Sequence, residues 1–206
     1  MKQLSKEWHH ARLGKITASR LSDVMSKIKS GYSASRKNYM MQLICEKLSG
    51  YKEEGHTNAA MQRGIDVEPI ARGAYEADKG LFVEECGFIV HPVESGFGAS
   101  PDGLVSDDGL IEIKCPNTAT HVEFLKSGKP KREYILQMYG QMLCTGRKWC
   151  DFVSYDDRLP GLEYKCVRVN YDHDINLGNE IIMEVTKFLN EMEKELNEIN
   201  KLRAAA

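Results

Sequence analysis

Apolar residues recur along this chain at two spacings, which predict helices near both ends and strands between them. Spacings of three or four residues mark helices over residues 36–48 and 132–144 and in a long segment that follows Asp174. The apolar stripe of that last segment comprises Ile181, Ile182, Val185, Phe188, Leu189, Met192, Leu196 and Ile199. A stripe of this kind is expected to pack against a core. Capping residues and closing glycines predict shorter helices over residues 5–14, 17–28, 57–77 and 118–126.

Strand-like runs fill the middle of the chain. They cover residues 81–90, 97–100, 149–155 and 162–171, together with a hairpin within residues 100–116. Asp107-Asp108-Gly109 supplies the hairpin turn, because Asp and Gly tolerate a positive φ. The order of elements predicts an α/β fold with a central mixed sheet, mostly antiparallel and flanked by helices. At 206 residues and 23.3 kDa, the chain is expected to form one domain over residues 1–206.

The second strand of the hairpin carries an acid and an amine on one face. Strand alternation places Glu112 and Lys114 opposite Ile111 and Ile113. Burying these charged groups on an apolar strand is costly, which indicates a functional use. Asp102 occupies a Pro-Asp-Gly bend just before the hairpin and can direct its carboxylate to the same place. Two carboxylates that converge beside a lysine favour a hard divalent cation, although a solvated salt bridge is the alternative.

A third carboxylate is expected from the helix over residues 57–77. Gly64, Glu68 and Ala71 fall on one face of this helix, and the small residues allow its backbone to approach closely. Pro69 is expected to bend the helix or to begin a second one. The alternative is that Glu68 is a structural partner of Arg72, four residues later.

Basic residues are concentrated at the front of the chain. Residues 1–48 hold ten Lys or Arg against three acids, a net charge of +7, which leaves −9 for the rest of a chain whose net charge is −2. Thr17 and Ser19 can begin a helix there, and helix starts with hydroxyls favour anions. Three cations, Arg12, Lys15 and Arg20, flank these hydroxyls. The distribution favours a localised phosphate-binding surface, with simple capping and a solvated face as the alternatives.

Composition excludes several other classes of protein. No run approaches the roughly 20 apolar residues of a membrane helix, and the first residues lack a signal-peptide core. The six cysteines are scattered without a Cys-x-x-Cys pair, which predicts reduced thiols in a cytoplasm and argues against a zinc or iron–sulfur site. The expected location is therefore cytoplasmic, and no membrane partner is expected.

Three motifs resemble those of known nucleases. Asp102 followed by Glu112-x-Lys114 is similar to the signature of the nuclease superfamily with an Asp and (Asp/Glu)-x-Lys motif. Residues 7–19, Glu-Trp-His-His-Ala-Arg-Leu-Gly-Lys-Ile-Thr-Ala-Ser, resemble the opening motif of the phage recombination exonucleases typified by lambda exonuclease, the YqaJ-type viral recombinases. Arg63-Gly64-x-x-x-Glu68-Pro69 is similar to a further motif of that family.

The resemblance runs from about residue 7 to residue 171 and implies a fold, an activity and partners. It implies a restriction-endonuclease-like core and a processive 5′→3′ exonuclease on double-stranded DNA ends that leaves 3′ single-strand overhangs. It further implies a ring-shaped homotrimer that threads the duplex, and a single-strand annealing protein as partner in phage-type homologous recombination. A phage or prophage origin in a bacterial cytoplasm follows from the same resemblance.

The resemblance and the chemistry together assign roles to individual residues. Asp102, Glu112 and the backbone carbonyl of Ile113 are expected to hold one or two Mg²⁺ ions, with Mn²⁺ as a possible substitute and Glu68 in support. Lys114 is expected to orient or deprotonate the attacking water, with a pKa lowered by partial burial.

The same resemblance assigns the residues that contact the DNA. The position of Arg12 binds the DNA 5′ phosphate in the family, with help from the hydroxyl of Ser19. Thr17 is expected at the same site. Gln137 matches a family glutamine that positions DNA or a metal-bound water. A second family amide is replaced by Tyr139, and Gln141 is the candidate substitute.

Other functions remain open at the level of the sequence. An endonuclease of the same superfamily would use the same acids and lysine. A Cas4-like iron–sulfur nuclease would need four cysteines, and Cys144, Cys150 and Cys166 lack its spacing. A non-catalytic DNA-end binding module on a decayed nuclease fold is a different class, against which the intact Asp102, Glu112 and Lys114 argue.

Overall fold

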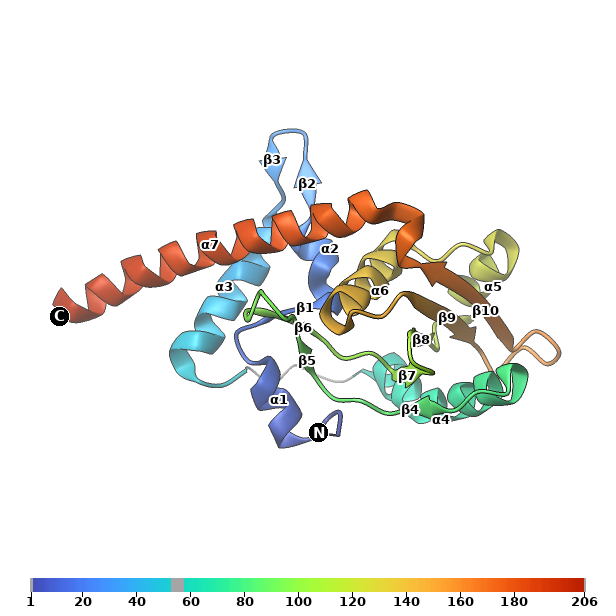
Figure 1. Ribbon diagram of the computed structural model, residues 1–206. Helices are drawn as coiled ribbons and strands as arrows, with labels where there is room; N and C mark the ends of the chain where they lie inside the picture. Colours follow the sequence, from blue (N-terminus) through green and yellow to red (C-terminus); the bar gives the residue numbers. More distant parts are fainter. Residues whose placement is uncertain (1, 53–57, 206) are drawn as a thin grey trace.

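A five-stranded mixed sheet forms the centre of the fold in the computed structural model, which describes residues 2–52 and 58–205 (Figure 1). Its strand order is β10-β9-β8-β7-β4. The strands are β4 (Val83–Glu84), β7 (Gly103–Val105), β8 (Gly109–Lys114), β9 (Trp149–Tyr155) and β10 (Tyr164–Asn170). The pair β8–β9 is parallel and the other three pairs are antiparallel, which confirms the predicted mixed and mostly antiparallel sheet.

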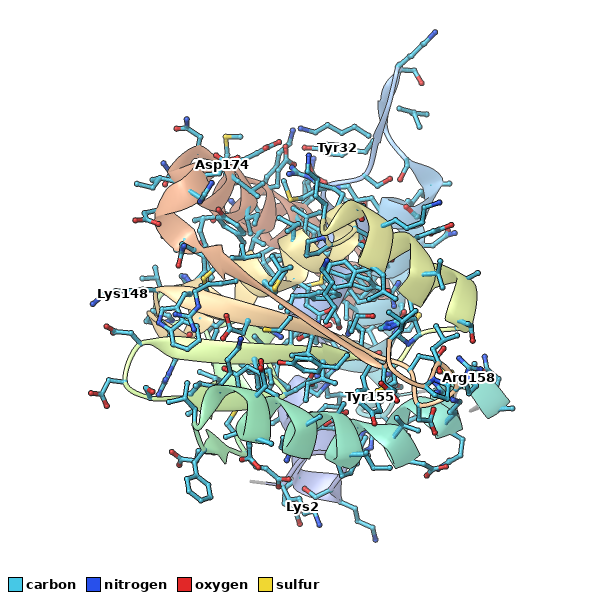
Figure 2. All side chains as sticks on the ribbon, turned by 90° about the vertical axis from the view of Figure 1, so that its right-hand side faces the viewer. Lys2, Tyr32, Lys148, Tyr155, Arg158 and Asp174 are labelled. Atoms are coloured by element: carbon cyan, nitrogen blue, oxygen red, sulfur yellow. The ribbon has the colours of Figure 1, made fainter. Side chains whose placement is uncertain are left out.

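Helices cover both faces of this sheet (Figure 2). Helix α4 (Ala59–Lys79) lies against one face, where its Ala71 and Tyr75 pack with Ile111 and Ile113. The other face is covered by α5 (Thr118–Ser127) and α6 (Arg132–Thr145), with Phe152 among the buried residues. The predicted alternation along β8 is therefore confirmed.

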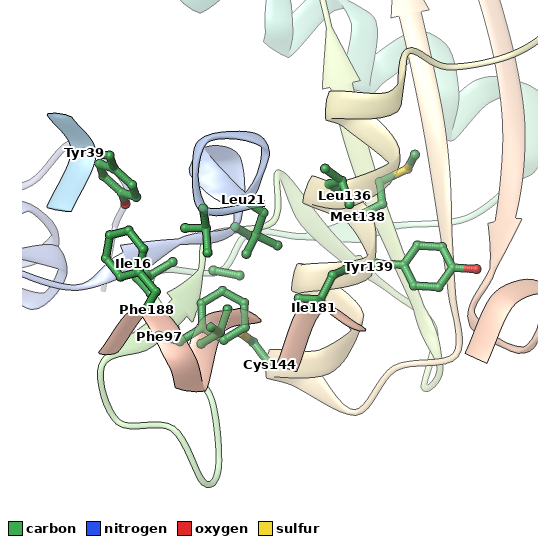
Figure 3. Close-up of a cluster of buried hydrophobic side chains, with 14 of the residues drawn as sticks. Ile16, Leu21, Tyr39, Phe97, Leu136, Met138, Tyr139, Cys144, Ile181 and Phe188 are labelled. Carbon is green, nitrogen blue, oxygen red and sulfur yellow. The ribbon is translucent and has the colours of Figure 1, made fainter. Parts of the chain in front are cut away.

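A second sheet and the terminal helices form the rest of the core (Figure 3). This sheet has the order β1-β6-β5, with β1 (Ile16–Thr17), β5 (Ile89–Val90) and β6 (Phe97–Ala99). Around it lie α1 (Lys6–Arg12), α3 (Ala34–Ser49) and α7 (Ile175–Ala205). The apolar stripe of α7 is buried as predicted at Ile181, Val185, Phe188, Met192 and Leu196.

The prediction of a helix over residues 17–28 is wrong for most of that range. The chain instead forms β1, a 3-10 turn η1 (Ala18–Arg20) and the short helix α2 (Leu21–Val24). Parallel pairing of Ile16 and Thr17 with β6 draws the capping hydroxyl of Thr17 into a strand. The end of the predicted helix and the residues after it form a small hairpin of β2 (Lys27–Ile28) and β3 (Gly31–Tyr32).

The strand predicted over residues 81–90 is divided between the two sheets. Its first part, β4, pairs with β7, whereas its second part, β5, pairs with β6. The hairpin turn is where the sequence predicts it, but its positive φ of 49° falls on Ser106. Pro69 lies inside the single helix α4 and does not begin a second one. Thr57, the predicted start of this helix, lies outside the described residues.

None of the helices in the described ranges is both long enough and apolar enough to cross a membrane.

Candidate active site

The site is built on an unpaired edge of β8, the strand that carries Glu112 and Lys114. Because β7 is short, it pairs only with Gly109–Ile111, so the last three residues of β8 have a strand neighbour on one side alone. Asp102, in the bend just before β7, fills the vacated edge: its Oδ2 accepts the Ile113 backbone N–H at 2.6 Å. In a strand, the N–H and C=O of one residue point the same way. The Ile113 carbonyl therefore faces this edge together with Asp102.

Glu112 is the residue before Ile113 on β8, and it is completely buried beneath α6. Its Oε1 accepts the Gln137 amide at 2.7 Å and its Oε2 accepts the Gln141 amide at 2.5 Å. The two glutamines are one helical turn apart, so α6 presents both amides to one carboxylate. Gln141 is itself fully buried, so its amide reaches Glu112 and is not exposed to solvent.

Lys114 completes the group at the open end of the strand. Its ammonium forms an ion pair with Glu112, and its side chain is 28 % exposed. Burial works to lower the pKa of Lys114, but Glu112 and Asp102 outweigh burial and raise it above its usual range. The lowered pKa expected from the sequence is therefore wrong for this arrangement, because two carboxylates stabilise the charged amine.

Glu68 extends into the site from α4 and is paired with Arg72 of the same helix. Its Oε1 accepts a hydrogen bond from Arg72 at 3.0 Å, which is the structural pairing that the sequence leaves open. Burial raises the pKa of Glu68, and the nearby charge of Glu112 adds to the effect. Burial followed by the charge of Glu112 likewise raises the pKa of Asp102 well above its usual value. The carboxylates thus repel one another across the site.

The donor set of this site fits a hard divalent cation. Three carboxylates and one carbonyl, without sulfur or imidazole, are ligands typical of Mg²⁺ or Mn²⁺. Within residues 2–52 and 58–205, however, the acids are not gathered in a ready three-residue metal cluster. Each carboxylate is held by a donor of the chain: Ile113 N–H on Asp102, Arg72 on Glu68, and Lys114 with the two amides on Glu112. Burial and repulsion together raise the pKa of Asp102 and Glu68, and a cation bound between the carboxylates would offset both effects.

A separate polar cavity of about 230 Å³ lies at the predicted phosphate site. Its lining includes Arg12, Lys15, Thr17, Ser19 and Arg20, so the structure brings together the hydroxyls and cations singled out in the sequence. The hydroxyls of Thr17 and Ser19 are 3.2 Å apart. Burial lowers the pKa of Arg12, although the side chain stays charged at neutral pH.

Ser100, which sequence reasoning did not single out as a functional residue, connects this cavity to the bend that carries Asp102. Its Oγ accepts hydrogen bonds from Trp8 Nε1 at 2.9 Å and from Arg12 Nη1 at 3.2 Å. The Arg12 guanidinium also lies 4.0 Å from the centroid of the Trp8 ring. Since Ser100 is two residues before Asp102, the phosphate cavity and the carboxylates share one short segment. Only its place beside Pro101-Asp102 could have pointed to it.

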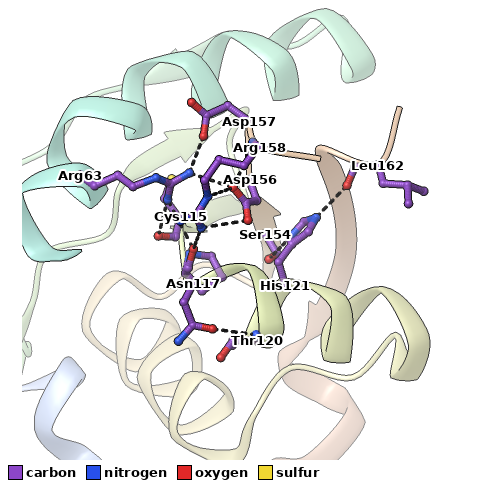
Figure 4. A network of polar contacts seen from close by, with 11 residues as sticks. Arg63, Cys115, Asn117, Thr120, His121, Ser154, Asp156, Asp157, Arg158 and Leu162 are labelled. Carbon is purple, nitrogen blue, oxygen red and sulfur yellow. Dashed lines mark hydrogen bonds and ion pairs between the residues drawn. The ribbon is translucent and has the colours of Figure 1, made fainter. Parts of the chain in front are cut away.

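A second polar cluster fixes the far end of β8 (Figure 4); it joins Arg63 of the family motif to Asp156, which sequence reasoning did not single out. Arg63 reaches from α4 to the carbonyls of Cys115 and Pro116 at 3.3 and 3.4 Å and to Asp156 Oδ1 at 2.9 Å. Asp156 is fully buried and also accepts two hydrogen bonds from the side chain of Arg158. Because Cys115 directly follows Lys114, these contacts of Arg63 and Asp156 hold in place the end of the strand that carries the lysine.

Comparisons with known proteins agree with this geometry. Residues 7–148 match the model of the YqaJ-like viral recombinase domain. The solved structure of LHK-Exo in complex with dAMP is similar to this chain at 56 % identity and a TM-score of 0.91, over 98 % of this chain and 99 % of that one. An alkaline exonuclease, LHK-Exo from Laribacter hongkongensis, is similar at 55 % identity and a TM-score of 0.90, with the same coverage.

A more distant likeness concerns the fold alone. A phage-related exonuclease from Haemophilus somnus 129PT is 18 % identical, with a TM-score of 0.64 over 88 % of this chain and 96 % of that one. No curated protein matches the chain. The mixed sheet with helices on both faces is a restriction-endonuclease-like fold, as the sequence predicts.

Proposed function

The chain belongs to the YqaJ-like viral recombinase family, and from this premise we propose that it is a metal-dependent deoxyribonuclease that degrades double-stranded DNA from its 5′ ends. The observation that carries the proposal is Asp102, Glu112 and Lys114 meeting at the unpaired end of β8. The exonuclease activity named for its 55 % identical relative supports it. The finer proposal includes processive 5′→3′ digestion that leaves 3′ overhangs for recombination by single-strand annealing.

Each residue of the site has a task in phosphodiester hydrolysis. Asp102, Glu112, the Ile113 carbonyl and Glu68 would hold Mg²⁺, which supplies an activated water and neutralises charge on the scissile phosphate. Gln137 and Gln141 keep the Glu112 carboxylate in one orientation. Lys114, charged in this arrangement, orients the attacking water and stabilises charge that develops on the phosphate.

The test of this function compares linear and circular duplex DNA. Linear DNA with a label at either end of one strand is expected to be degraded from the 5′ end in the presence of Mg²⁺, and not in the presence of EDTA. Cleavage of circular DNA would instead support an endonuclease. Binding without cleavage of either substrate would support the DNA-end binding module.

Recognition of the DNA end is assigned to the polar cavity around Arg12. Replacing Arg12 with alanine is expected to lower kcat/KM on 5′-phosphorylated ends about tenfold or more, because a hydrogen bond to a charged group contributes roughly 1.5–3 kcal/mol. The rate on 5′-hydroxyl ends should change little. Lys6→Ala, which removes a positive charge from an exposed position of the same helix, is the control. An equal loss on both kinds of end would contradict the assignment.

Assembly and location complete the proposal. We propose that residues 1–206 act as one nuclease domain, that three copies close into a ring around the duplex, and that the enzyme works in a bacterial cytoplasm with a single-strand annealing protein. A ring would allow processive digestion despite a net charge of only −2. Light scattering that gives a monomer in solution would contradict the ring.

A further inference from the structure

An apolar cavity opens beside Lys114, the lysine of the proposed active site. Its volume is about 480 Å³, which is within the range of small-molecule sites, and Lys114 is part of its lining. The aromatic side chains Phe124, Tyr134 and Phe152 form its walls. These aromatic residues neither hold the carboxylates of the site nor line the cavity around Arg12.

Tyr134 is the wall residue with the largest accessible surface. It is half-buried, whereas Phe124 and Phe152 are 6 % and 2 % exposed. The ring of Tyr134 stacks on Phe152, with centroids 5.3 Å apart and planes 24° apart, and Phe152 meets Phe124 edge-on. Lys114 Nζ lies 5.4 Å from the centroid of the Tyr134 ring. A rigid aromatic surface thus begins next to the amine that acts on the phosphate.

The rim of this cavity is positively charged. Lys126, Lys129 and Lys131 line it, with Glu123 as the one acid among its lining residues. In the described part of the chain, the lysines that form ion pairs are others: Lys27, Lys79, Lys114 and Lys148. The three rim lysines are exposed and therefore available to an anion. An apolar floor with a basic rim suits a nucleotide, whose base is flat and whose phosphate is charged.

We propose that this cavity binds the base of the nucleotide on the 3′ side of the scissile phosphate, with Tyr134 as its stacking surface and the rim lysines on the following phosphate. The proposal rests on the proposed exonuclease function. Along the degraded strand, the terminal phosphate occupies the cavity around Arg12 and the scissile phosphate lies at Lys114, so the next nucleotide is the one that reaches the aromatic cavity. A space of 480 Å³ accepts one unpaired nucleotide but not a duplex.

The experiment pairs a change in the enzyme with a change in the substrate. Removing the base of the second nucleotide from the 5′ end, as an abasic site, is expected to lower kcat/KM of the wild-type enzyme at least fivefold. Tyr134→Leu should lower kcat/KM on normal DNA by a similar factor. The abasic site should lower kcat/KM of this variant little further, because the ring on which the base would stack is already absent. Tyr134→Phe, which keeps the ring, should behave as wild type. An abasic site at the tenth nucleotide is the substrate control.

Equal losses from the abasic site in the wild type and in Tyr134→Leu would overturn the proposal. A binding measurement separates this result from failure of the proposed function. 2-Aminopurine at the second nucleotide should be quenched on binding to Asp102→Asn, and this quenching should be lost when Tyr134→Leu is added. Lys194→Ala, on the exposed face of α7, should leave the signal unchanged. Quenching that persists without the tyrosine ring would overturn the proposal, even if the enzyme cuts no DNA.

Discussion

Replacing Lys114 with alanine is expected to lower kcat for DNA hydrolysis roughly 10²–10³-fold, the range found when one donor that stabilises developing charge is removed. The amine pairs with the buried Glu112, and it also lines the aromatic cavity. Its removal takes away both the group that orients water and a charge that stabilises the phosphate. Single-turnover cleavage of an end-labelled duplex measures the effect without a contribution from product release.

Binding to DNA ends should survive this substitution, because the phosphate cavity is made by other residues. Lys148→Ala is a matched control: Lys148 also pairs with an acid, Asp108, but its side chain is 72 % exposed. This control should retain the wild-type rate, since exposed ion pairs contribute at most about 1 kcal/mol. A wild-type rate in Lys114→Ala would show that the role given to the amine is wrong.

Replacing Asp156 with alanine is expected to lower the free energy of unfolding by about 1.5–3 kcal/mol, the usual contribution of a hydrogen bond to a charged group. Asp156 is fully buried and receives hydrogen bonds from Arg63 and Arg158, so its loss removes the one buried carboxylate that the two guanidinium groups share. Urea denaturation followed by tryptophan fluorescence measures the change. Asp157→Ala is the matched control, because Asp157 also pairs with Arg63 but is 46 % exposed. It should cost no more than about 1 kcal/mol.

The pH dependence of stability offers a second check on Asp156. Burial would raise the pKa of this carboxyl, but hydrogen bonds from Arg158 and Thr118 outweigh burial and hold the pKa below its usual value. A lowered folded-state pKa stabilises the protein above the unfolded-state pKa, about 3.9, and the stabilisation is lost as the pH falls below it. The stability difference between wild type and Asp156→Asn should therefore be largest near neutral pH and shrink below about pH 4. A constant difference down to pH 2 would contradict this role.

Local signals in the sequence predict much of the fold. The turn between β7 and β8, the amphipathic stripe of α7 and the glycine that closes α5 depend on neighbours close in the chain, and all are confirmed. The helix predicted to start near Thr17 fails because pairing with β6, about 80 residues later, decides that segment. The division of residues 81–90 between two sheets has the same origin, since two different partner strands compete for one run.

The candidate site also contains residues that local sequence signals predict and residues that depend on distant contacts. Asp102, Glu112 and Lys114 could be found because strand alternation and one bend bring them together. The tasks of Ser100 and of Asp156 depend on contacts with Arg12 and Arg63, which are 88 and 93 residues away. No periodicity in the sequence carries that information. The raised pKa of Lys114 was missed for a related reason, because the pKa depends on how close two acids approach in the folded chain.

The short β7 strand has a consequence for the design of inactive variants. The Asp102 carboxylate accepts the hydrogen bond from the Ile113 amide that a backbone carbonyl of a longer β7 would otherwise accept. Alanine at this position would leave that amide without its acceptor, so lost catalysis and local fraying would occur together. Asparagine keeps a carbonyl oxygen at the same place and removes only the charge. Hydrogen exchange at the Ile113 amide would tell the two defects apart.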